Sequence, residues 1–498
     1  MDISEYRAQF ASFNSSLELV RFHTHAGLKS QLTIDEIYDR YGDLFSADAI
    51  STLKAFHEHI PAGQETQQKS VAGLIASACV HYAEKKASEI SNELKRCEAA
   101  CEIAWRGETL TVEAALERMA READKDLRRD LCARWLDSIL ECNDLRSARF
   151  ASLNEAAKLQ GSENFSKLNQ ALDRTTISTF LRDTESSYNV ALSKLLARES
   201  LNLSRDDLAF SELVHIERLP WLDEYYPALG FAKIQAETTR GLGIRTDQQR
   251  GITLDSEPRQ SRKGLAACFP IEPPRDVRVA MLQQAGAASF LDALNCTGKA
   301  QFHAWCSPNL VSRNPEFVYA ADSATSYSYG YLFRYLPIEA RWNLDFMTGI
   351  DDEKARRIAR DLTFHMALQA RRLSVEAVYD PTVLTEQGGE DLRVAYESSF
   401  DEAMSFKSRL EFWLFGAYKA QSSLAKLRAL AFSATLREHL RVRFGHRWWT
   451  SRKAGDELID LWSTSSTYSV EELSSLLGFG ELSFDLLAQV INSGLAGD

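Results

Sequence analysis

Proline and glycine are scarce in this chain, which contains 11 prolines and 24 glycines among 498 residues. Turns depend on these residues, so their scarcity disfavours a β-rich fold in which many short strands are joined by turns. It favours long helices instead, because both residues destabilise a helix interior. No stretch approaches the roughly 18 consecutive apolar residues that indicate a membrane-spanning helix. The sequence therefore predicts a mostly α-helical protein without a membrane span.

Cysteine is also sparse, with eight residues in the whole chain. Their spacings do not form the paired CxxC pattern of a structural zinc site. Cys97 and Cys101 are one helical turn apart and are interpreted as ordinary helix residues rather than metal ligands. So few cysteines favour reduced thiols and a cytoplasmic location. The first residues, MDISEYRAQFASFNSS, lack a basic segment followed by an apolar one, so no secretory signal is expected.

The net charge of −12 comes from acidic and basic residues that are mixed along the chain. A general nucleic-acid binder usually carries a basic stripe, so nucleic acid is not an expected partner. A membrane is not an expected partner either. The hydrophobic content of 45% is ordinary for a globular protein and permits a large buried core.

Helix boundaries can be read at several places. Ser469 and Glu472 have the spacing of a capping box, and Gly478 stands where a glycine would end that helix. The segments from about 68 to 104 and from about 109 to 160 also have apolar residues at helical spacing. These patterns predict long helices on both sides of the middle of the chain.

Strands are expected only between about residues 250 and 285. There a segment rich in proline, arginine and serine, Asp255–Arg275, precedes a short apolar run, Val277–Met281. A helix-sized segment, Ala287–Trp305, follows. This order predicts one small sheet beside a central helix.

The stretch from Leu254 to Trp305 resembles the core of the thimet oligopeptidase and oligoendopeptidase family of helical zinc peptidases, in particular a bacterial branch. DSATSYSYGYLF, Asp322 to Phe333, is similar to the second helix of that family's site. The stretches His23–Phe45 and Leu436–Trp462 also resemble that branch, so the likeness extends over the whole chain. The resemblance implies a mostly α, zincin-like fold with two lobes flanking a deep cleft. The lobes would span residues 1–200 and 201–498, with one small sheet beside the former zinc helix.

Such peptidases bind Zn²⁺ through two histidines four residues apart on one helix and a glutamate on a second helix. A glutamate after the first histidine acts as general base on the zinc-bound water. In this register Asn295 and Lys299 replace the histidines, and Cys296 replaces the general base. Tyr327 replaces the third ligand, 28 residues after Lys299 (327 − 299), which is an interval typical of the family.

These replacements predict the loss of zinc. A lysine ammonium repels Zn²⁺ and has no lone pair to offer. No other HExxH motif occurs in the chain. We therefore expect no zinc, no other cofactor and no catalytic residue, and interpret the chain as an inactive pseudo-peptidase that holds a peptide or protein or acts in regulation. In this hypothesis Lys299 supplies the positive charge of the lost metal, while Asn295 and Tyr327 hydrogen-bond its ammonium.

Two alternatives remain open at this stage. Cys296, Lys299 and His303 share one helix face, so the ammonium could lower the pKa of the thiol and create a repurposed enzyme. The ordinary interpretation is that Cys296 and His303 are packing residues. The second alternative is a residual peptidase whose metal site has shifted, for example to Glu316, which has no histidine pair in register.

Further candidates for a cleft are His303, Asp322, Tyr329 and Tyr331. The tyrosines could line a peptide-binding surface, or they could be core aromatics. A basic loop with Arg259, Arg262 and Lys263 could hold a carboxylate or phosphate, although such a run is more often a solvated turn.

Overall fold

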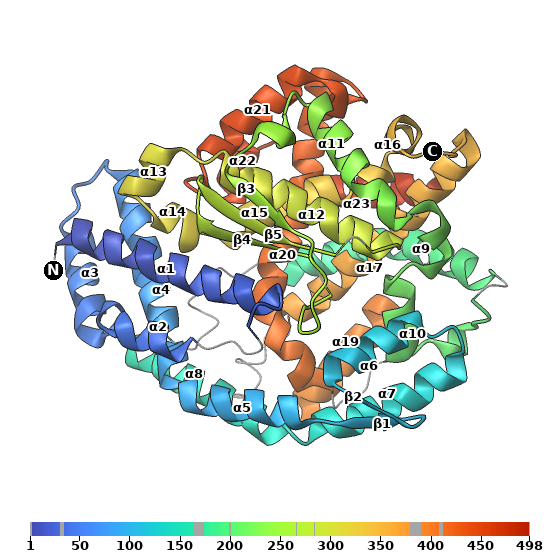
Figure 1. The fold of residues 1–498 in the computed structure, drawn as a ribbon, viewed down its shortest axis with the longest axis horizontal. Helices are drawn as coiled ribbons and strands as arrows, with labels where there is room; N and C mark the ends of the chain where they lie inside the picture. Colours follow the sequence, from blue (N-terminus) through green and yellow to red (C-terminus); the bar gives the residue numbers. More distant parts are fainter. Residues whose placement is uncertain are drawn as a thin grey trace. The chain divides into compact units, whose positions relative to one another are not determined.

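The computed structural model describes residues 2–29, 34–162, 174–198, 201–264, 266–282, 284–378, 390–407 and 412–497. Regular structure in these ranges is overwhelmingly α-helical, as the low proline and glycine content predicted (Figure 1). Within the same ranges, no helix is both long enough and apolar enough to span a membrane.

The chain divides into two compact units, each assembled from three segments. Unit 1 comprises Met1–Tyr82, Tyr225–Ala359 and Arg428–Leu487. Unit 2 comprises Ala83–Glu224, Arg360–Leu427 and Ala488–Asp498. The boundary at residue 200 and the deep cleft expected from the sequence stay predictions.

The helices and strands have the following bounds. In unit 1 they are α1 (Ile3–His25), α2 (Asp35–Arg40), α3 (Ala47–Glu58), α11 (Phe231–Gly241), β3 (Ile252–Asp255), β4 (Ala267–Glu272), β5 (Asp276–Ala280), α12 (Ala287–Ala304), α13 (Pro308–Arg313), α14 (Glu316–Tyr319), α15 (Ser323–Arg334), α16 (Ala340–Phe346), α21 (Arg452–Ser463) and α22 (Val470–Leu476). In unit 2 they are α5 (Ser88–Ala100), β1 (Ile103–Trp105), β2 (Glu108–Leu110), α6 (Val112–Arg121), α7 (Lys125–Leu140), α8 (Asn143–Leu159), α9 (Arg174–Leu196), α10 (Phe210–Glu217) and α19 (Glu390–Met404). Four helices cross a boundary between the segments: α4 (Glu65–Lys86), α17 (Asp352–Val378), α20 (Phe412–Phe444) and α23 (Asp485–Ala496).

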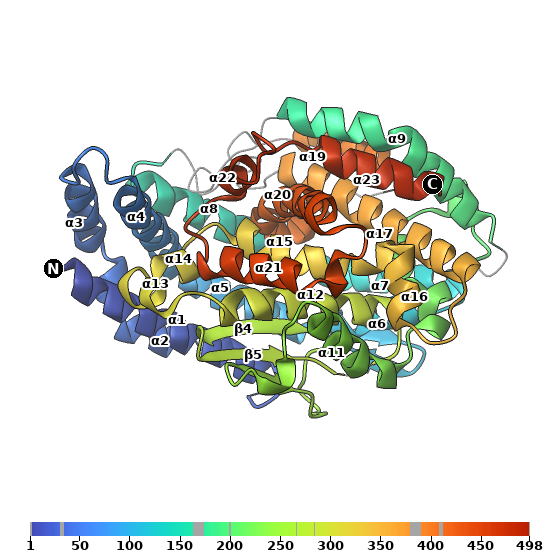
Figure 2. The ribbon, with the colours of Figure 1, turned by 90° about the horizontal axis from the view of Figure 1, so that it is seen from above.

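The small sheet of unit 1 lies where the sequence predicted it. Its strand order is β3-β5-β4, with β3 parallel and β4 antiparallel to β5. Figures 1 and 2 show these strands alongside α12, with α1 running along β4. Phe22 of α1 packs edge-on against Phe269 of β4, with ring centroids 5.7 Å apart. The alternating side chains of β4 therefore face α1 on one side and α12 on the other.

The expectation that strands occur only between residues 250 and 285 was wrong. In unit 2, β1 and β2 form an antiparallel hairpin in which Trp105 pairs with Glu108. Its two turn residues, Arg106 and Gly107, both have positive φ, at 52° and 84°. Tight two-residue hairpins need that backbone conformation. The hairpin is held by tertiary packing, because the buried Ile103 and Trp105 belong to a core cluster with helices α6 and α7.

Two glycines allow α12 and α15 to pack closely in unit 1. A Cβ at Gly298 would clash with the carbonyl group of Tyr329, whose carbon would lie at 2.8 Å. A Cβ at Gly330 would lie 2.8 Å from Oδ1 of Asn295. Each helix thus places a residue without a side chain where the other helix approaches. This contact explains why position 298 requires a glycine.

Helix α22 of unit 1 begins and ends where the sequence predicted. Ser469 accepts a hydrogen bond from the backbone N–H of Glu472, and the Glu472 side chain accepts one from the N–H of Ser469. Gly478 has a φ of +88° just after α22 ends. This confirms the capping box and the terminating glycine.

The expectation of reduced thiols was wrong for two cysteines. Cys97 and Cys142 form a disulfide although 45 residues separate them. The packing of α5 against α8 brings these two cysteines together. No local sequence pattern indicates this pairing. Cys79, Cys101, Cys132, Cys268, Cys296 and Cys306 are free thiols.

Candidate functional site

The residues that the sequence resemblance places at zinc-motif positions come from two helices of unit 1. Asn295, Cys296 and Lys299 lie on α12, and Tyr327 lies on α15. Because the two helices cross at Gly298 and Gly330, the middle of α12 faces the middle of α15. The tertiary structure thus brings together residues that only a motif comparison connects in the sequence.

Lys299 contacts Tyr327 through the face of its ring. The ammonium nitrogen lies 4.2 Å from the ring centre, which is the geometry of a cation–π contact. The hydrogen bonds that this ammonium was expected to donate to Asn295 and Tyr327 stay a prediction. Burial lowers the pKa of Lys299, while the nearby thiols Cys296 and Cys268 act in the opposite direction.

Asn295 lies at the crossing of α12 with α15. Its amide oxygen is next to the backbone of Gly330, and the terminal methylene of Lys299 approaches the same glycine. An imidazole at position 295 would point to the same place, since side chains four residues apart on a helix share one face. Asn295 and Lys299 therefore approach the same point of α15 from one face of α12.

Cys296 and His303 are buried, and burial shifts the pKa of each side chain away from neutral pH. Burial raises the pKa of the Cys296 thiol to about 12, and the opposing effect of Lys299 is smaller. Lys299 does act to lower the pKa of this thiol, as the alternative supposed, but desolvation of the thiolate outweighs the attraction of the ammonium. Burial and Lys299 both lower the pKa of His303, to about 3, so its imidazole is neutral. These shifts disfavour a repurposed enzyme that uses the Cys296 thiolate as a nucleophile.

Cys268 is a residue of this site that the sequence did not single out. It lies on β4 and interacts electrostatically with Cys296 and Lys299. Burial raises the pKa of its thiol as well. Its neighbours in the strand, Ala267 and Phe269, face α1. The only sequence feature that could have indicated this position of Cys268 is the alternation of side chains along a strand.

The residues suggested for a cleft are structural in this unit. Asp322 caps the start of α15 by accepting a hydrogen bond from the N–H of Ala324 at 3.0 Å. Tyr329 is fully buried and stacks on Phe302, with ring centroids 5.2 Å apart. Tyr331 is buried and stacks on Tyr335. The structure therefore places both tyrosines in the core around α15.

Glu316, suggested for a shifted metal site, is fully buried in a polar network. Its carboxylate accepts hydrogen bonds from Arg7 and Asn314 at 3.0 and 3.1 Å, and another from Ser70. In the described ranges, no group of three or more His, Cys, Asp or Glu side chains is placed to hold a metal ion. Glu316 is thus neutralised by an arginine.

The basic loop is an internally paired turn. Arg259 donates two hydrogen bonds to the carboxylate of Asp255, at 2.9 and 3.0 Å, and Arg262 forms an ion pair with the same group. The two arginines hold the pKa of Asp255 at about 2, against the opposing effect of burial. Two of the three candidate cations therefore already have a carboxylate partner.

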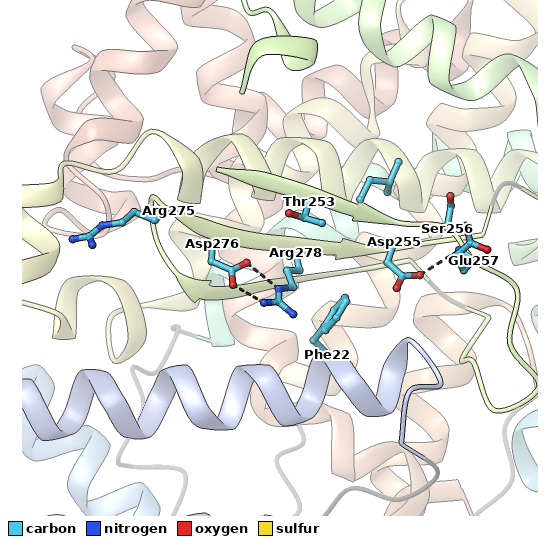
Figure 3. A pocket seen from close by; sticks show the side chains of 9 residues that line it. Phe22, Thr253, Asp255, Ser256, Glu257, Arg275, Asp276 and Arg278 are labelled. Atoms are coloured by element: carbon cyan, nitrogen blue, oxygen red, sulfur yellow. Dashed lines mark hydrogen bonds and ion pairs between the residues drawn. The ribbon is translucent and has the colours of Figure 1, made fainter. Parts of the chain in front are cut away.

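A cavity of about 560 Å³ opens beside β3, as Figure 3 shows. In it Arg278 makes two hydrogen bonds to Asp276, at 2.9 and 2.7 Å, and lies over the ring of Phe22. None of the residues that line it belongs to α12 or α15. The charged groups in its wall largely neutralise one another, and it is separate from the residues of the lost motif.

Known structures share this architecture. PZ peptidase A in complex with inhibitor 2 superposes with a TM-score of 0.60 over 93% of this chain and 88% of that one, at 12% sequence identity. A Bacillus anthracis protein assigned as oligoendopeptidase F gives a TM-score of 0.61 over 93% and 86% of the two chains, at 13% identity. This chain has the fold of these helical peptidases. No protein-family model and no curated protein matches its sequence.

The donor groups at the motif positions do not fit the zinc that the resemblance implies. The peptidase fold presents an amide, a thiol of raised pKa and an ammonium along α12, with an aromatic ring opposite. The ammonium of Lys299 is in contact with the ring of Tyr327, the residue expected at the third-ligand position. We therefore derive no catalytic step through zinc for this protein.

Proposed function

We propose that this protein is a pseudo-peptidase: a peptidase-like protein that does not hydrolyse peptides with zinc and instead holds a peptide or protein segment. The contact between the Lys299 ammonium and the Tyr327 ring supports this proposal most directly. In the proposed register a side-chain cation takes the position of the divalent ion, and Cys296 takes the position of the base that would activate water. The cytoplasmic location expected from the sequence is part of the same proposal.

The ammonium of Lys299 also indicates the kind of group that the protein would bind. In the described part of the chain, Lys299 makes no ion pair with a carboxylate. Asp292, an acidic residue that raises the pKa of Lys299, is paired with Arg334. An ammonium in a partly buried position is stabilised by an anionic partner. We therefore propose that a peptide carboxylate, from a C-terminus or an acidic side chain, is the group that Lys299 accepts.

Metal content and hydrolysis test the first part of the proposal. The protein is purified without chelator, incubated with excess Zn²⁺, desalted and analysed by elemental mass spectrometry, and a mixed peptide library is then added. We expect much less than one zinc per chain and no new peptide termini. One zinc per chain together with cleavage would overturn the loss of catalysis.

Peptide binding tests the second part independently. The same library is applied with free and with amidated C-termini, and binding is followed by thermal stabilisation. We expect stabilisation by acidic or free-carboxylate peptides, and its loss in Lys299→Met. Lys453→Met, which removes an exposed lysine from α21, is the matched control and should bind as the wild type does. Equal binding by Lys299→Met would exclude the ammonium as the recognition group.

A further inference from the structure

Three cysteines of unit 2 meet at the end of α5. Cys97 lies in the last turns of α5, and Cys101 directly follows that helix. Cys142 lies in the turn between α7 and α8. Cys97 and Cys142 form the disulfide, and the sulfur of Cys101 lies 3.8 Å from the sulfur of Cys142. Cys142 therefore has a bonded neighbour and a free thiol within contact distance.

The two potential partners of Cys142 differ in their exposure. Cys101 is only 5% exposed and packs with Leu94 and Cys142 in one apolar cluster, whereas Cys97 is only partly buried. The Cys101 thiol lies near the backbone carbonyls of Cys97 and Ser138, at 3.4 and 3.3 Å, and can donate to either one. With either hydrogen bond, the Cys101 sulfur stays close to the sulfur of Cys142.

The geometry requires only a small movement for the alternative bond to form. A disulfide has a sulfur–sulfur distance of about 2.0 Å, so the sulfurs of Cys101 and Cys142 must approach by less than about 2 Å. Cys101 lies outside the helix in extended backbone, with φ −65° and ψ 113°. Rotation about its Cα–Cβ bond is therefore not restricted by a preceding helical turn in the way that it is for Cys97.

We propose that Cys142 is a thiol–disulfide exchange site whose disulfide alternates between Cys97 and Cys101. The Cys101 thiol loses its proton to solvent, and the thiolate attacks the sulfur of Cys142. The bond between Cys101 and Cys142 forms while the bond between Cys97 and Cys142 breaks, and the electron pair leaves on Cys97, which takes up a proton. One disulfide and one thiol are present before and after, so no oxidant or reductant is consumed.

The exchange changes which thiol can react with other molecules. Before it the free thiol is the buried Cys101, and after it the free thiol is the partly exposed Cys97. Cys97 would then be accessible to a small disulfide or to an alkylating reagent. The site thus couples a bond rearrangement inside unit 2 to the appearance of a modifiable thiol on its surface.

Alkylation without a reductant tests this exchange in the full-length chain. Oxidised wild type is incubated with iodoacetamide at mildly alkaline pH, quenched in acid and digested, and its disulfides are mapped by mass spectrometry. We expect alkylated Cys97 together with a Cys101–Cys142 crosslink. In Cys101→Ser, alkylation of Cys97 should be at least about tenfold slower, because no thiol remains to displace it. Cys79→Ser leaves all three cysteines in place and should behave as the wild type does.

A second variant makes the test independent of the alkylation rate. Cys97→Ser is incubated with glutathione disulfide, and we expect a Cys101–Cys142 crosslink to form in it. Three results would overturn the proposal: equal alkylation of Cys97 in wild type and Cys101→Ser, persistent free thiols at Cys101 and Cys142 in folded Cys97→Ser, or an oxidised wild type without any bond to Cys142. If Cys97→Ser does not fold, the comparison of wild type with Cys101→Ser decides the question alone.

Discussion

The backbone of Gly298 in α12 lies against the carbonyl group of Tyr329 in α15, so closely that an added Cβ would come within 2.8 Å of the carbonyl carbon. The neighbouring atom is backbone and cannot rotate away. This contact between the two helices keeps Asn295 and Lys299 opposite α15. It involves none of the residues that a zinc site would need.

Alanine at position 298 should destabilise the protein strongly. The clash with α15 forces the two helices apart, and overpacking of this kind costs about 1–3 kcal/mol or more of unfolding free energy. The matched control is Gly73→Ala in α4, where a Cβ meets nothing within 4 Å. There alanine should stabilise the protein by about 0.5–1 kcal/mol, because it favours the helix. Urea denaturation of both variants measures the difference, and shifts of the same sign would contradict the proposed contact.

Restoring the motif should create a zinc site. A variant with Asn295→His, Cys296→Glu, Lys299→His and Tyr327→Glu places two imidazoles and a carboxylate around the helix crossing. We expect it to bind about one zinc per chain, as a site with three protein ligands does. The control carries the other three substitutions but keeps Lys299, whose ammonium should prevent binding. A folded fourfold variant that binds no zinc would show that α12 and α15 do not have the proposed register.

Acid should lower the free energy of unfolding of the protein through a buried histidine of unit 1. Burial lowers the pKa of His81 to about 3 from its ordinary value of 6.5, and Arg21 contributes in the same direction. The unfolded chain therefore takes up this proton at a higher pH than the folded chain does. The stability due to neutral His81 is complete above pH 6.5 and is lost as the pH falls toward 3.

Substitution of His81 tests whether this side chain causes the pH dependence of the unfolding free energy. His81 packs among Phe13, Tyr38 and Phe45, so His81→Phe preserves an aromatic ring there. We expect its unfolding free energy to fall less steeply between about pH 6.5 and pH 4 than that of wild type, where one titrating group contributes up to about 1.4 kcal/mol per pH unit. His446→Phe, at an exposed position, should leave the slope unchanged. Parallel pH profiles for wild type and His81→Phe would contradict this assignment.

Arg428 should contribute much more to stability than an exposed arginine. Its nearly buried guanidinium binds both oxygens of Glu471, at 2.8 and 2.6 Å, and pairs with Asp322 at 2.8 Å. Arg428→Met leaves two carboxylates without their cation and should cost about 3 kcal/mol of unfolding free energy. Arg134→Met, whose pair with Asp130 is about half exposed, should change the stability very little. Chemical denaturation would contradict the prediction if the two losses were equal.

The parts of the fold that could be predicted are those with local or motif-level signals. Low proline and glycine content indicated the helical class, and the run at Val277–Met281 indicated the sheet. The capping box at Ser469 was readable because both partners lie within one helical turn. Gly298 was a usable reference point because its backbone contact excludes every side chain.

The parts that were missed depend on contacts between distant segments. The hairpin at Trp105 is held by packing on helices α6 and α7. The bond between Cys97 and Cys142 spans 45 residues, and the proximity of Cys268 to Lys299 joins a strand to a helix. None of these has a periodic or composition signal, because a side chain's partner across the core is set by how whole elements pack.

The sequence by itself determined that the motif positions hold an amide, a thiol, an ammonium and a phenol, since residue identity alone decides whether a donor set can bind zinc. Only the tertiary structure decided how those groups meet. It placed the Lys299 ammonium over the face of the Tyr327 ring and raised the pKa of the Cys296 thiol, because contact geometry and burial arise from packing between helices and not from spacing along one of them.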